Sequence, residues 1–267
     1  MKKQSSMLIV ILFLVGFLCG CINPQTTEYF NKVIAADEFT VLNVSIIKGG
    51  LEIHAWNNDT IQLNAIKKSA FGQNELDKVE INIEKKGNDI EIEAIYTGDK
   101  FTPPSVDMNI KVPPYITVDT VTTSNGAIQI SGVKGDLIAT SSNGAIIIDN
   151  VDGYISALTS NGRIEVTGST GIKNLQSSNL GIIAEIYDFK DNISITTSNG
   201  GISVYFNPLL HADVEMKTSN GQISFHDIAL NMSMNDQKHK IGSIGNGGNI
   251  ILIQTSNGNI QINKLYN

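Results

Sequence analysis

The chain repeats a Ser-Asn-Gly triplet throughout its C-terminal half. Complete copies occupy 124–126, 142–144, 160–162, 198–200, 219–221 and 256–258, and a degenerate Ser-Asn-Leu-Gly copy occupies 178–181. The asparagine moves from 125 to 143, 161, 179, 199 and 220, so the period is 18, 18, 18, 20 and 21 residues. A period near 18 is too short for a pair of helices and suits one rung of a β-solenoid.

Aliphatic residues form columns when these repeats are aligned. Inward-facing columns are predicted at Ile128, Ile146, Ile164 and Ile182, and at Ile130, Ile148, Val166 and Ala184. The opposite wall is predicted from Val133 with Val151, Leu137 with Ile155, and Ala139 with Ala157 and Leu175. Three glycines align at the turn between the two walls: Gly135, Gly153 and Gly171. A tight turn there needs a positive φ or room for close approach. Each rung is thus strand, glycine turn, strand and Asn-Gly turn.

The Asn-Gly corner has a structural explanation that requires no ligand. Stacked asparagines can form a hydrogen-bonded ladder, glycine can supply a left-handed backbone, and the preceding serine or threonine can bond nearby backbone groups. The alternative is a repetitive outward surface that also binds something. The predicted corner residues are Asn125, Gly126, Asn143, Gly144, Asn161, Gly162, Asn179, Asn199, Gly200, Asn220, Gly221, Asn257 and Gly258.

Stacked rungs predict an all-β fold, a parallel β-solenoid of about 18–20-residue rungs over residues 119–267. Roughly seven rungs at ~4.8 Å would form a rod about 35 Å long. Exposed sheet edges at its ends would invite aggregation. We expect residues 39–118 to cap one end, and the insertion at 226–248 to shield the other.

The segment 39–118 reads as a β region of antiparallel-looking strands with period-2 alternation. A single turn of helix is predicted within 70–78. The expected strands are 41–47, 51–55, 61–66, 79–84, 90–95 and 106–112.

Residues 1–20 read as a signal peptide. Lys2 and Lys3 precede an apolar run at 7–17, and Leu18-Cys19-Gly20-Cys21 resembles a lipobox, at which a prolipoprotein is cut before a lipid-bearing cysteine. Cys21 would then carry palmitate-type chains, with a tether over 21–38. The alternative is an uncleaved anchor helix. Either predicts attachment to the extracytoplasmic face of the cell membrane.

Composition excludes several classes of function. The two cysteines are Cys19 in the signal peptide and Cys21 at the lipidation site, so the rest of the mature chain has no disulfide, thiolate metal site or cysteine nucleophile. Loss of Lys2 and Lys3 leaves 17 basic against 26 acidic side chains, a formal charge of −9. An acidic surface disfavours nucleic acid and anionic lipid.

The sequence also lacks the residues that calcium binding and glycan cleavage require. Calcium-binding repeats need an aspartate in each turn, whereas these corners carry asparagine, as does Gly245-Asn246-Gly247-Gly248. No cofactor is implied. A glycan-active enzyme needs a pair of carboxylates on one face. The acidic residues near the repeats do not align, and the four histidines stand singly: His54, His211, His226 and His239.

A family resemblance rests on three segments. These are Val112-Pro113-Pro114, the run 121–126 that ends in Thr-Ser-Asn-Gly, and the final Ile-Ile-Leu-Ile-Gln-Thr-Ser-Asn-Gly at 250–258. Together they resemble the putative adhesin family of cell-envelope proteins, over about residues 39–264. Lys48-Gly49-Gly50 resembles a divergent first copy of the corner. The resemblance implies a β-solenoid surface protein without known catalysis, some of whose relatives occur in envelope-stress systems of Gram-positive bacteria.

Three functional hypotheses follow. The first is a non-enzymatic envelope lipoprotein whose solenoid binds a surface polymer, protein or peptide. The second is a structural or envelope-stress signalling partner, and the third is a glycan-active β-helix enzyme. An exposed aromatic strip would favour binding, and a featureless polar face would favour scaffolding. The outward residues expected to discriminate are Gln129, Arg163, Glu165, Tyr205, Phe206 and Phe225.

Overall fold

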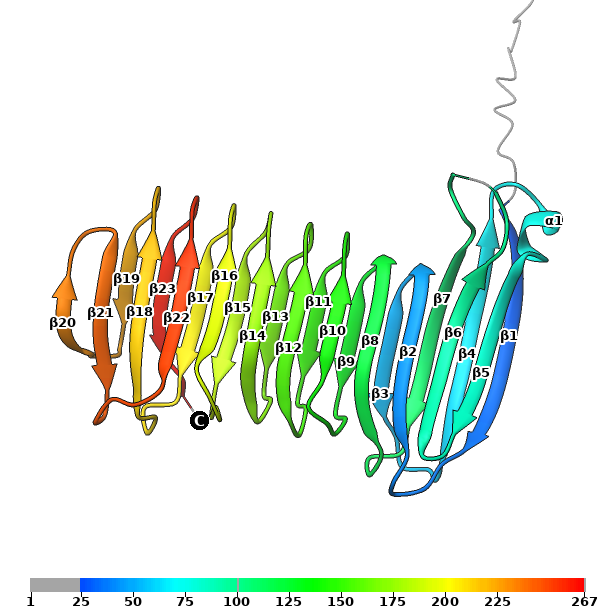
Figure 1. Cartoon of the computed structure of the whole chain (residues 1–267), viewed down its shortest axis with the longest axis horizontal. Coiled ribbons are helices and arrows are strands. Elements are labelled where there is room, and N and C mark those ends of the chain that lie inside the picture. Colours follow the sequence, from blue (N-terminus) through cyan, green and yellow to red (C-terminus); the bar gives the residue numbers. More distant parts are fainter. Residues whose placement is uncertain (1–24, 100, 267) are drawn as a thin grey trace, which may run out of the picture.

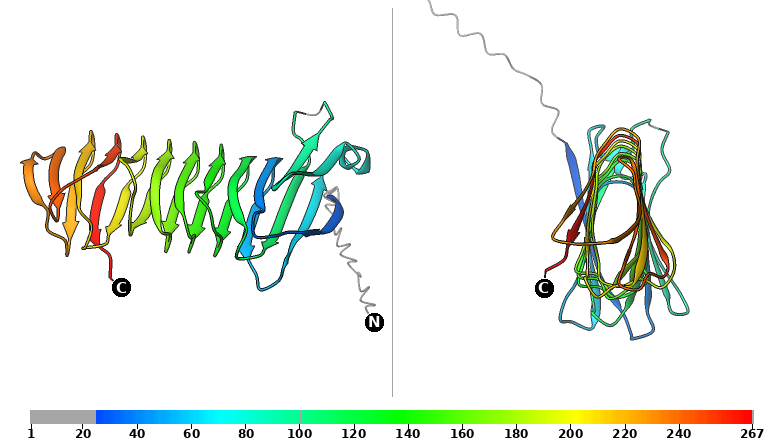
Figure 2. Two further views of the ribbon diagram at one scale, coloured as in Figure 1. Left: turned by 60° about the horizontal axis from the view of Figure 1, so that its bottom comes forward. Right: turned by 90° about the vertical axis from the view of Figure 1, so that its left-hand side faces the viewer.

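The protein is an elongated stack of strands in which two β-sheets face each other across one apolar core (Figure 1). The structure is a computed structural model that describes residues 25–99 and 101–266. Seen along its axis, the stack is a flattened oval tube (Figure 2). Cys21 and the signal peptide lie outside the described residues. Within the described part, no helix is long and apolar enough to cross a membrane.

Each sheet runs the full length of the stack. Sheet A has the spatial order β1 (Thr26–Ala35), β4 (Thr60–Ser69), β7 (Ser105–Val112), β3 (Leu51–Ala55), β9 (Ile128–Ser131), β11 (Ile146–Asp149), β13 (Ile164–Thr167), β15 (Ile182–Ile186), β17 (Ile202–Phe206), β23 (Ile260–Lys264) and β19 (Ile223–His226). Sheet B has the order β20 (Asn231–Asn235), β21 (His239–Ile244), β18 (Ala212–Thr218), β22 (Ile250–Thr255), β16 (Ile193–Thr197), β14 (Gly171–Ser177), β12 (Tyr154–Thr159), β10 (Ile138–Ser141), β8 (Thr117–Asn125), β2 (Val41–Lys48), β6 (Asp89–Tyr96) and β5 (Val79–Lys86). The short helix α1 (Gln73–Leu76) falls within the segment predicted for it.

The predicted all-β solenoid is confirmed by the strand register. β9, β11, β13 and β15 pair in parallel, with Ile128, Ile146, Ile164 and Ile182 side by side. On the facing wall, β10, β12 and β14 align Ala139, Ala157 and Leu175. All seven residues are at most 1% exposed. In-register parallel pairing therefore turns the sequence columns into a continuous core.

The N-terminal region differs from the predicted antiparallel arrangement. β2 pairs in parallel with both β6 and β8, and β3 in parallel with both β7 and β9. Antiparallel pairing joins only β1 to β4, β4 to β7 and β5 to β6 in this region. The prediction was right for the pairs β4–β7 and β5–β6 and wrong for β2 and β3, because alternation reports which face of a strand is buried, and not its direction. The Lys48-Gly49-Gly50 corner sends the chain into the opposite sheet instead of back along the same one.

This corner makes β2 and β3 the first rung of the solenoid. The Gly49 backbone N–H donates to the Asn125 carbonyl oxygen over 3.2 Å, and the Leu51 N–H donates to the Ala127 carbonyl over 2.9 Å. The divergent copy thus stacks directly on the first Ser-Asn-Gly corner. Both sheets continue across the boundary expected near residue 118.

Residues 26–35 form a strand, although we expected them to belong to the tether. β1 pairs antiparallel with β4 along all ten of its residues. Tyr29 and Val33 remain 72% and 61% exposed, and only Phe30 and Ile34 pack partly against the core, so backbone pairing with β4 is the main contact of this strand. The alternation rule misses this edge strand because its large apolar residues come in the adjacent pairs Tyr29-Phe30 and Val33-Ile34 and do not alternate with polar ones.

The C-terminal rung enters the stack out of sequence order. β22 lies between β16 and β18, and β23 lies between β17 and β19. In Figure 1 these red strands stand between the yellow and the orange ones. The insertion that precedes them supplies β20 and β21, which extend sheet B beyond β18 by antiparallel pairing. Residues 250–264 are therefore inserted between two rungs made earlier in the chain.

Candidate functional site

The asparagines of the repeated triplet lie at the corners drawn uppermost in Figure 1 and bond to one another. Asn143 Nδ2 donates to Asn125 Oδ1 over 2.7 Å, and Asn161 Nδ2 donates to Asn143 Oδ1 over 2.7 Å. The ladder continues through Asn179, Asn199, Asn257 and Asn220 at 2.6–3.0 Å. Each inner member both donates and accepts, so the amides are already engaged with their neighbours.

Glycine at these corners serves close approach. None of the Ser-Asn-Gly glycines has a positive φ, so the expectation of a left-handed backbone there is wrong. A Cβ on Gly144 would lie 1.7 Å from the Gly126 carbonyl oxygen, and one on Gly162 would lie 1.8 Å from that of Gly144. The corners stack backbone on backbone, which leaves no volume for any side chain. Gly49, in the divergent first copy, does have a positive φ of 131°.

A buried column of hydroxyl groups lies just inside the asparagine ladder. Thr159 Oγ1 donates to the Gly144 carbonyl over 3.0 Å and accepts the Gly162 backbone N–H over 3.1 Å. Ser141 makes the same two bonds to Gly126 and Gly144, both at 2.9 Å. These hydroxyl groups were predicted to bond nearby backbone, but their bonds between successive rungs were not predicted. The residue before each Ser-Asn-Gly was the available signal, because it is always serine or threonine: Thr123, Ser141, Thr159, Thr197, Thr218 and Thr255.

The broad outer faces carry no aromatic strip among the described residues. Phe206 is fully buried, contrary to expectation, because it alternates with Val204 toward the core and only Tyr205 between them can face outward. Phe225 packs partly against the core. Gln129 and Arg163 are exposed, and Glu165 is half-buried. Across β8 to β16, the outward columns on sheet B are polar or aliphatic and uncharged: Thr120, Ile138, Ser156, Asn174 and Ser194, and Thr122, Thr140, Leu158, Gln176 and Thr196.

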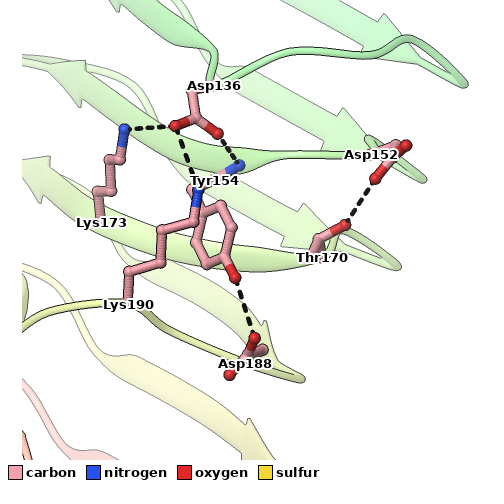
Figure 3. Close-up of polar contacts among 7 residues, drawn as sticks. All are labelled: Asp136, Asp152, Tyr154, Thr170, Lys173, Asp188 and Lys190. Atoms are coloured by element: carbon pink, nitrogen blue, oxygen red, sulfur yellow. Dashed lines mark hydrogen bonds and ion pairs between the residues drawn. The ribbon is translucent and has the colours of Figure 1, made fainter.

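Charged and aromatic side chains gather instead at the opposite corner, drawn lowermost in Figure 1, where the glycine turns lie (Figure 3). Asp136 Oδ2 lies 2.8 Å from Lys173 Nζ and 3.7 Å from Lys190 Nζ. Asp136 Oδ1 accepts the Tyr154 backbone N–H over 3.1 Å. The Tyr154 hydroxyl donates to Asp188 Oδ2 over 2.9 Å, and Lys190 Nζ lies 4.0 Å from the centre of the Tyr154 ring. This lower-corner cluster links four successive turns of the chain.

The surroundings of Asp136 and Tyr154 shift the pKa values of both side chains. The hydrogen bond from Lys173 holds the pKa of Asp136 below the usual aspartate value, and the Tyr154 N–H and the charge of Lys190 act in the same direction. Burial raises the pKa of Tyr154, and its hydrogen bond to the Asp188 carboxylate raises it further. Asp136 is therefore a stable carboxylate and Tyr154 a stable phenol near neutral pH. Asp152, at the edge of Figure 3, accepts the Thr170 hydroxyl over 3.3 Å.

Beside Asp188 the lower corner is hollowed. This corner hollow has a volume of about 490 Å³. It is lined by Tyr187, Asp188, Phe189, Asn207, Leu209, Leu210, His211 and Asn249. A smaller hollow of about 270 Å³ lies along the glycine turns between Pro114 and Thr170. In the described residues, no three histidine or carboxylate side chains gather in a way that could hold a metal ion.

Comparison with known proteins identifies the architecture. A family model described as Toastrack DUF4097 matches residues 43–263. No match is found among curated proteins. Among solved structures, the chain is similar to a putative cell adhesion protein from Clostridium sporogenes ATCC 15579, with 17% identity over 90% of this chain and 100% of that one, and a TM-score of 0.37. It is also similar to a putative adhesin from Bacteroides fragilis NCTC 9343, with 12% identity over 89% and 97% of the two chains and a TM-score of 0.48.

Proposed function

The chain belongs to the Toastrack DUF4097 family, and on that premise we propose that it is a membrane-anchored cell-envelope protein that binds a surface polymer, protein or peptide without catalysing a reaction. Lipid on Cys21 would hold it at the extracytoplasmic face of the cell membrane. The observation that carries the proposal is the lower-corner cluster. It is an aromatic and charged surface on a stack whose asparagine corners bond to one another.

The state of the Asp136 carboxylate favours binding over catalysis. A general acid in glycan cleavage needs a carboxyl group whose pKa is raised toward the working pH. The pKa of Asp136 is instead lowered by Lys173, and both of its oxygens are occupied. A fixed carboxylate of this kind orients neighbouring groups and does not deliver a proton.

An anchor on Cys21 would leave the rungs of the stack accessible. The described residues begin at 25 and lead into β1, which is the edge strand of sheet A at the N-terminal end of the stack. A lipid on Cys21 would therefore hold that end near the membrane, and the rungs would extend away from it. Two or more acyl chains would make this attachment stable, since a single chain holds only reversibly.

The anchor is tested by Cys21→Ala in the full chain. We expect the wild-type protein to incorporate an alkyne-tagged palmitate analogue and to fractionate with membranes. The variant should lose the label and leave the membrane fraction. An unlabelled variant that stays in the membrane would instead support the uncleaved anchor helix.

The binding role is tested by co-sedimentation of the detergent-solubilised full chain with purified cell envelopes. Retention on envelopes stripped of protein by protease would identify a polymer as the ligand. Retention only on untreated envelopes would identify a protein or peptide. A chain that sediments with neither has no envelope ligand, and the structural or stress-signalling role would replace our proposal.

A further inference from the structure

The corner hollow lies where the turn at 207–211 crosses the inserted rung of β22 and β23. Residues 250–264 enter the stack from β21 and form β22 and β23 on either side of one upper corner. The turn at 207–211 must therefore reach from β17 past β22 to β18, while the turn at 187–192 joins β15 directly to β16. The two turns therefore diverge, and the corner hollow lies between them.

The turns around this gap are also the irregular ones. Across a regular lower corner, the core residues of the two facing walls are 11 positions apart in the sequence, as Ile164 and Leu175 are. The equivalent span is 13 positions from Ile182 to Ile195, and 14 from Ile202 to Met216. The extra residues bring Tyr187, Phe189 and His211 to the hollow. The hollow therefore lies where successive rungs differ, away from the repeated motif.

Its lining combines aromatic surface with unused hydrogen-bonding groups. Tyr187 and Phe189 are half-buried, and the Tyr187 hydroxyl is held by Glu185 over 3.2 Å. Asn207 uses Oδ1 to accept the Leu209 N–H, and Asn249 uses Nδ2 to donate to the Lys190 carbonyl. In the described part of the chain, nothing bonds to Asn207 Nδ2, Asn249 Oδ1 or Asp188 Oδ1. One donor and two acceptors thus remain beside two ring surfaces.

We propose that the corner hollow binds one uncharged saccharide residue of an envelope polysaccharide, a proposal that rests on the binding function above. A sugar ring offers hydroxyl groups that donate and accept, matching the free amide and carboxylate atoms. Its apolar C–H face can lie against the rings of Tyr187 and Phe189. The volume of about 490 Å³ falls in the ordinary range for ligand sites, about 300–1,000 Å³.

Other ligand classes match this lining less well. An anionic polymer would meet the Asp188 carboxylate on an acidic chain, and the Lys190 ammonium is turned toward Asp136 and the Tyr154 ring. A peptide strand needs unpaired backbone at a sheet edge. Here the Asn207 N–H already donates to the Ile186 carbonyl, and the Leu210 N–H donates to the Asn207 carbonyl.

The test is binding of the detergent-solubilised full chain to an array of neutral oligosaccharides, with polyglutamate and teichoic acid as anionic probes. Asp188→Asn keeps an acceptor for the Tyr154 hydroxyl but turns the free oxygen into a donor. Asn207→Asp keeps the acceptor for the Leu209 N–H but removes the free donor. The matched control is Asp152→Asn, the same change at the same corner but outside the hollow. Circular dichroism melting checks that each variant folds.

We expect a neutral oligosaccharide to bind, each hollow variant to bind it about tenfold more weakly, and the control to bind like wild type. No neutral binding, preferential binding of the anionic probes, or equal binding by hollow variants and wild type would each overturn the saccharide site. Envelope co-sedimentation that survives in the hollow variants would leave the proposed function standing while removing this site. Loss of co-sedimentation in the wild type would remove the proposed function itself.

Discussion

Asn257 donates its side-chain amide to Asn199 Oδ1 over 2.8 Å, although the two residues are 58 positions apart. Asn220, which follows Asn199 in the repeat, bonds instead to Asn257 over 2.7 Å. The ladder therefore passes from 199 to 257 and only then to 220. The contact between Asn257 and Asn199 therefore shows that the C-terminal rung is inserted next to the rung of Asn199. The corner hollow lies beside this insertion.

The order of the rungs can be tested by disulfide cross-linking. Neighbouring strands lie ~4.8 Å apart, within the Cα range of disulfides, about 4.4–6.8 Å. We expect Asn199→Cys with Asn257→Cys to form a disulfide on mild oxidation, mapped by mass spectrometry. The control pair, Asn199→Cys with Asn220→Cys, lies two strand spacings apart and should stay reduced. The reverse pattern would mean that the rungs stack in sequence order.

Gly162→Ala should be strongly destabilising because the new Cβ would lie 1.8 Å from the Gly144 carbonyl oxygen. We expect a loss of about 3 kcal/mol or more in the free energy of unfolding, measured by urea denaturation. The control is Gly201→Ala, whose Cβ has its nearest neighbour at 3.4 Å. Similar losses in both variants would show that steric contact between corners is not the reason for glycine.

Thr159→Val should unfold more easily because it leaves the Gly144 carbonyl and the Gly162 N–H buried without their partner. The expected cost is about 2–3 kcal/mol in the free energy of unfolding. Thr159→Ser keeps the hydroxyl, as Ser141 does one rung away, and should cost less than about 1 kcal/mol. If valine and serine proved equally stable, the hydroxyl column would have no stabilising role.

Asp136→Asn should change how stability depends on pH. The pKa of Asp136 is lower in the folded chain, so its carboxylate adds stability above the usual aspartate pKa of about 3.9, and this is lost as pH falls through the folded value. The side chain is 43% exposed, so solvent screening limits the effect to under about 1 kcal/mol. We expect the melting-temperature gap between wild type and variant to be constant at pH 5–8 and to close below about pH 4.

Lys173→Gln provides the matched control for this pH effect. It removes the strongest cause of the lowered Asp136 pKa while the carboxylate remains. The acid-induced loss should then begin at a higher pH than in the wild type. A gap between wild type and Asp136→Asn that persists unchanged at pH 3 would contradict the assignment.

Much of the rung could be predicted from local sequence. The isoleucine columns at 128, 146, 164 and 182 and the facing column at 139, 157 and 175 follow from the period, because parallel in-register strands bury the same position in each repeat. The parallel direction of β2 and β3 could not be predicted, because alternation does not report strand direction. The edge strand β1 was missed because its apolar residues do not alternate with polar ones. The inward position of Phe206 was missed because adjacent aromatic residues hide which of them continues the column.

The candidate site could not be predicted from the sequence. Tyr154, Lys173 and Lys190 belong to different rungs, and only stacking brings them to one carboxylate at Asp136. The glycine-rich link at 245–248 has positive φ at Gly245, Gly247 and Gly248. It passes close against His211 and Asp213, where a Cβ on Gly245 would lie 2.2 Å from His211 Nδ1. The close approach to His211 and Asp213, together with the positive φ values, explains why this link is rich in glycine although it lacks the aspartate of a calcium loop.

The sequence by itself determined the rung: its length, its buried columns, its asparagine corner and hence a stack of parallel strands. Only the tertiary structure decided the order in which the rungs stack. Every Ser-Asn-Gly corner presents the same amide, the same hydroxyl and the same strand edges, so local chemistry cannot distinguish one neighbour from another. The 20- and 21-residue spacings and the β20–β21 insertion break that equivalence, and the geometry that they impose opens the hollow where we place the ligand.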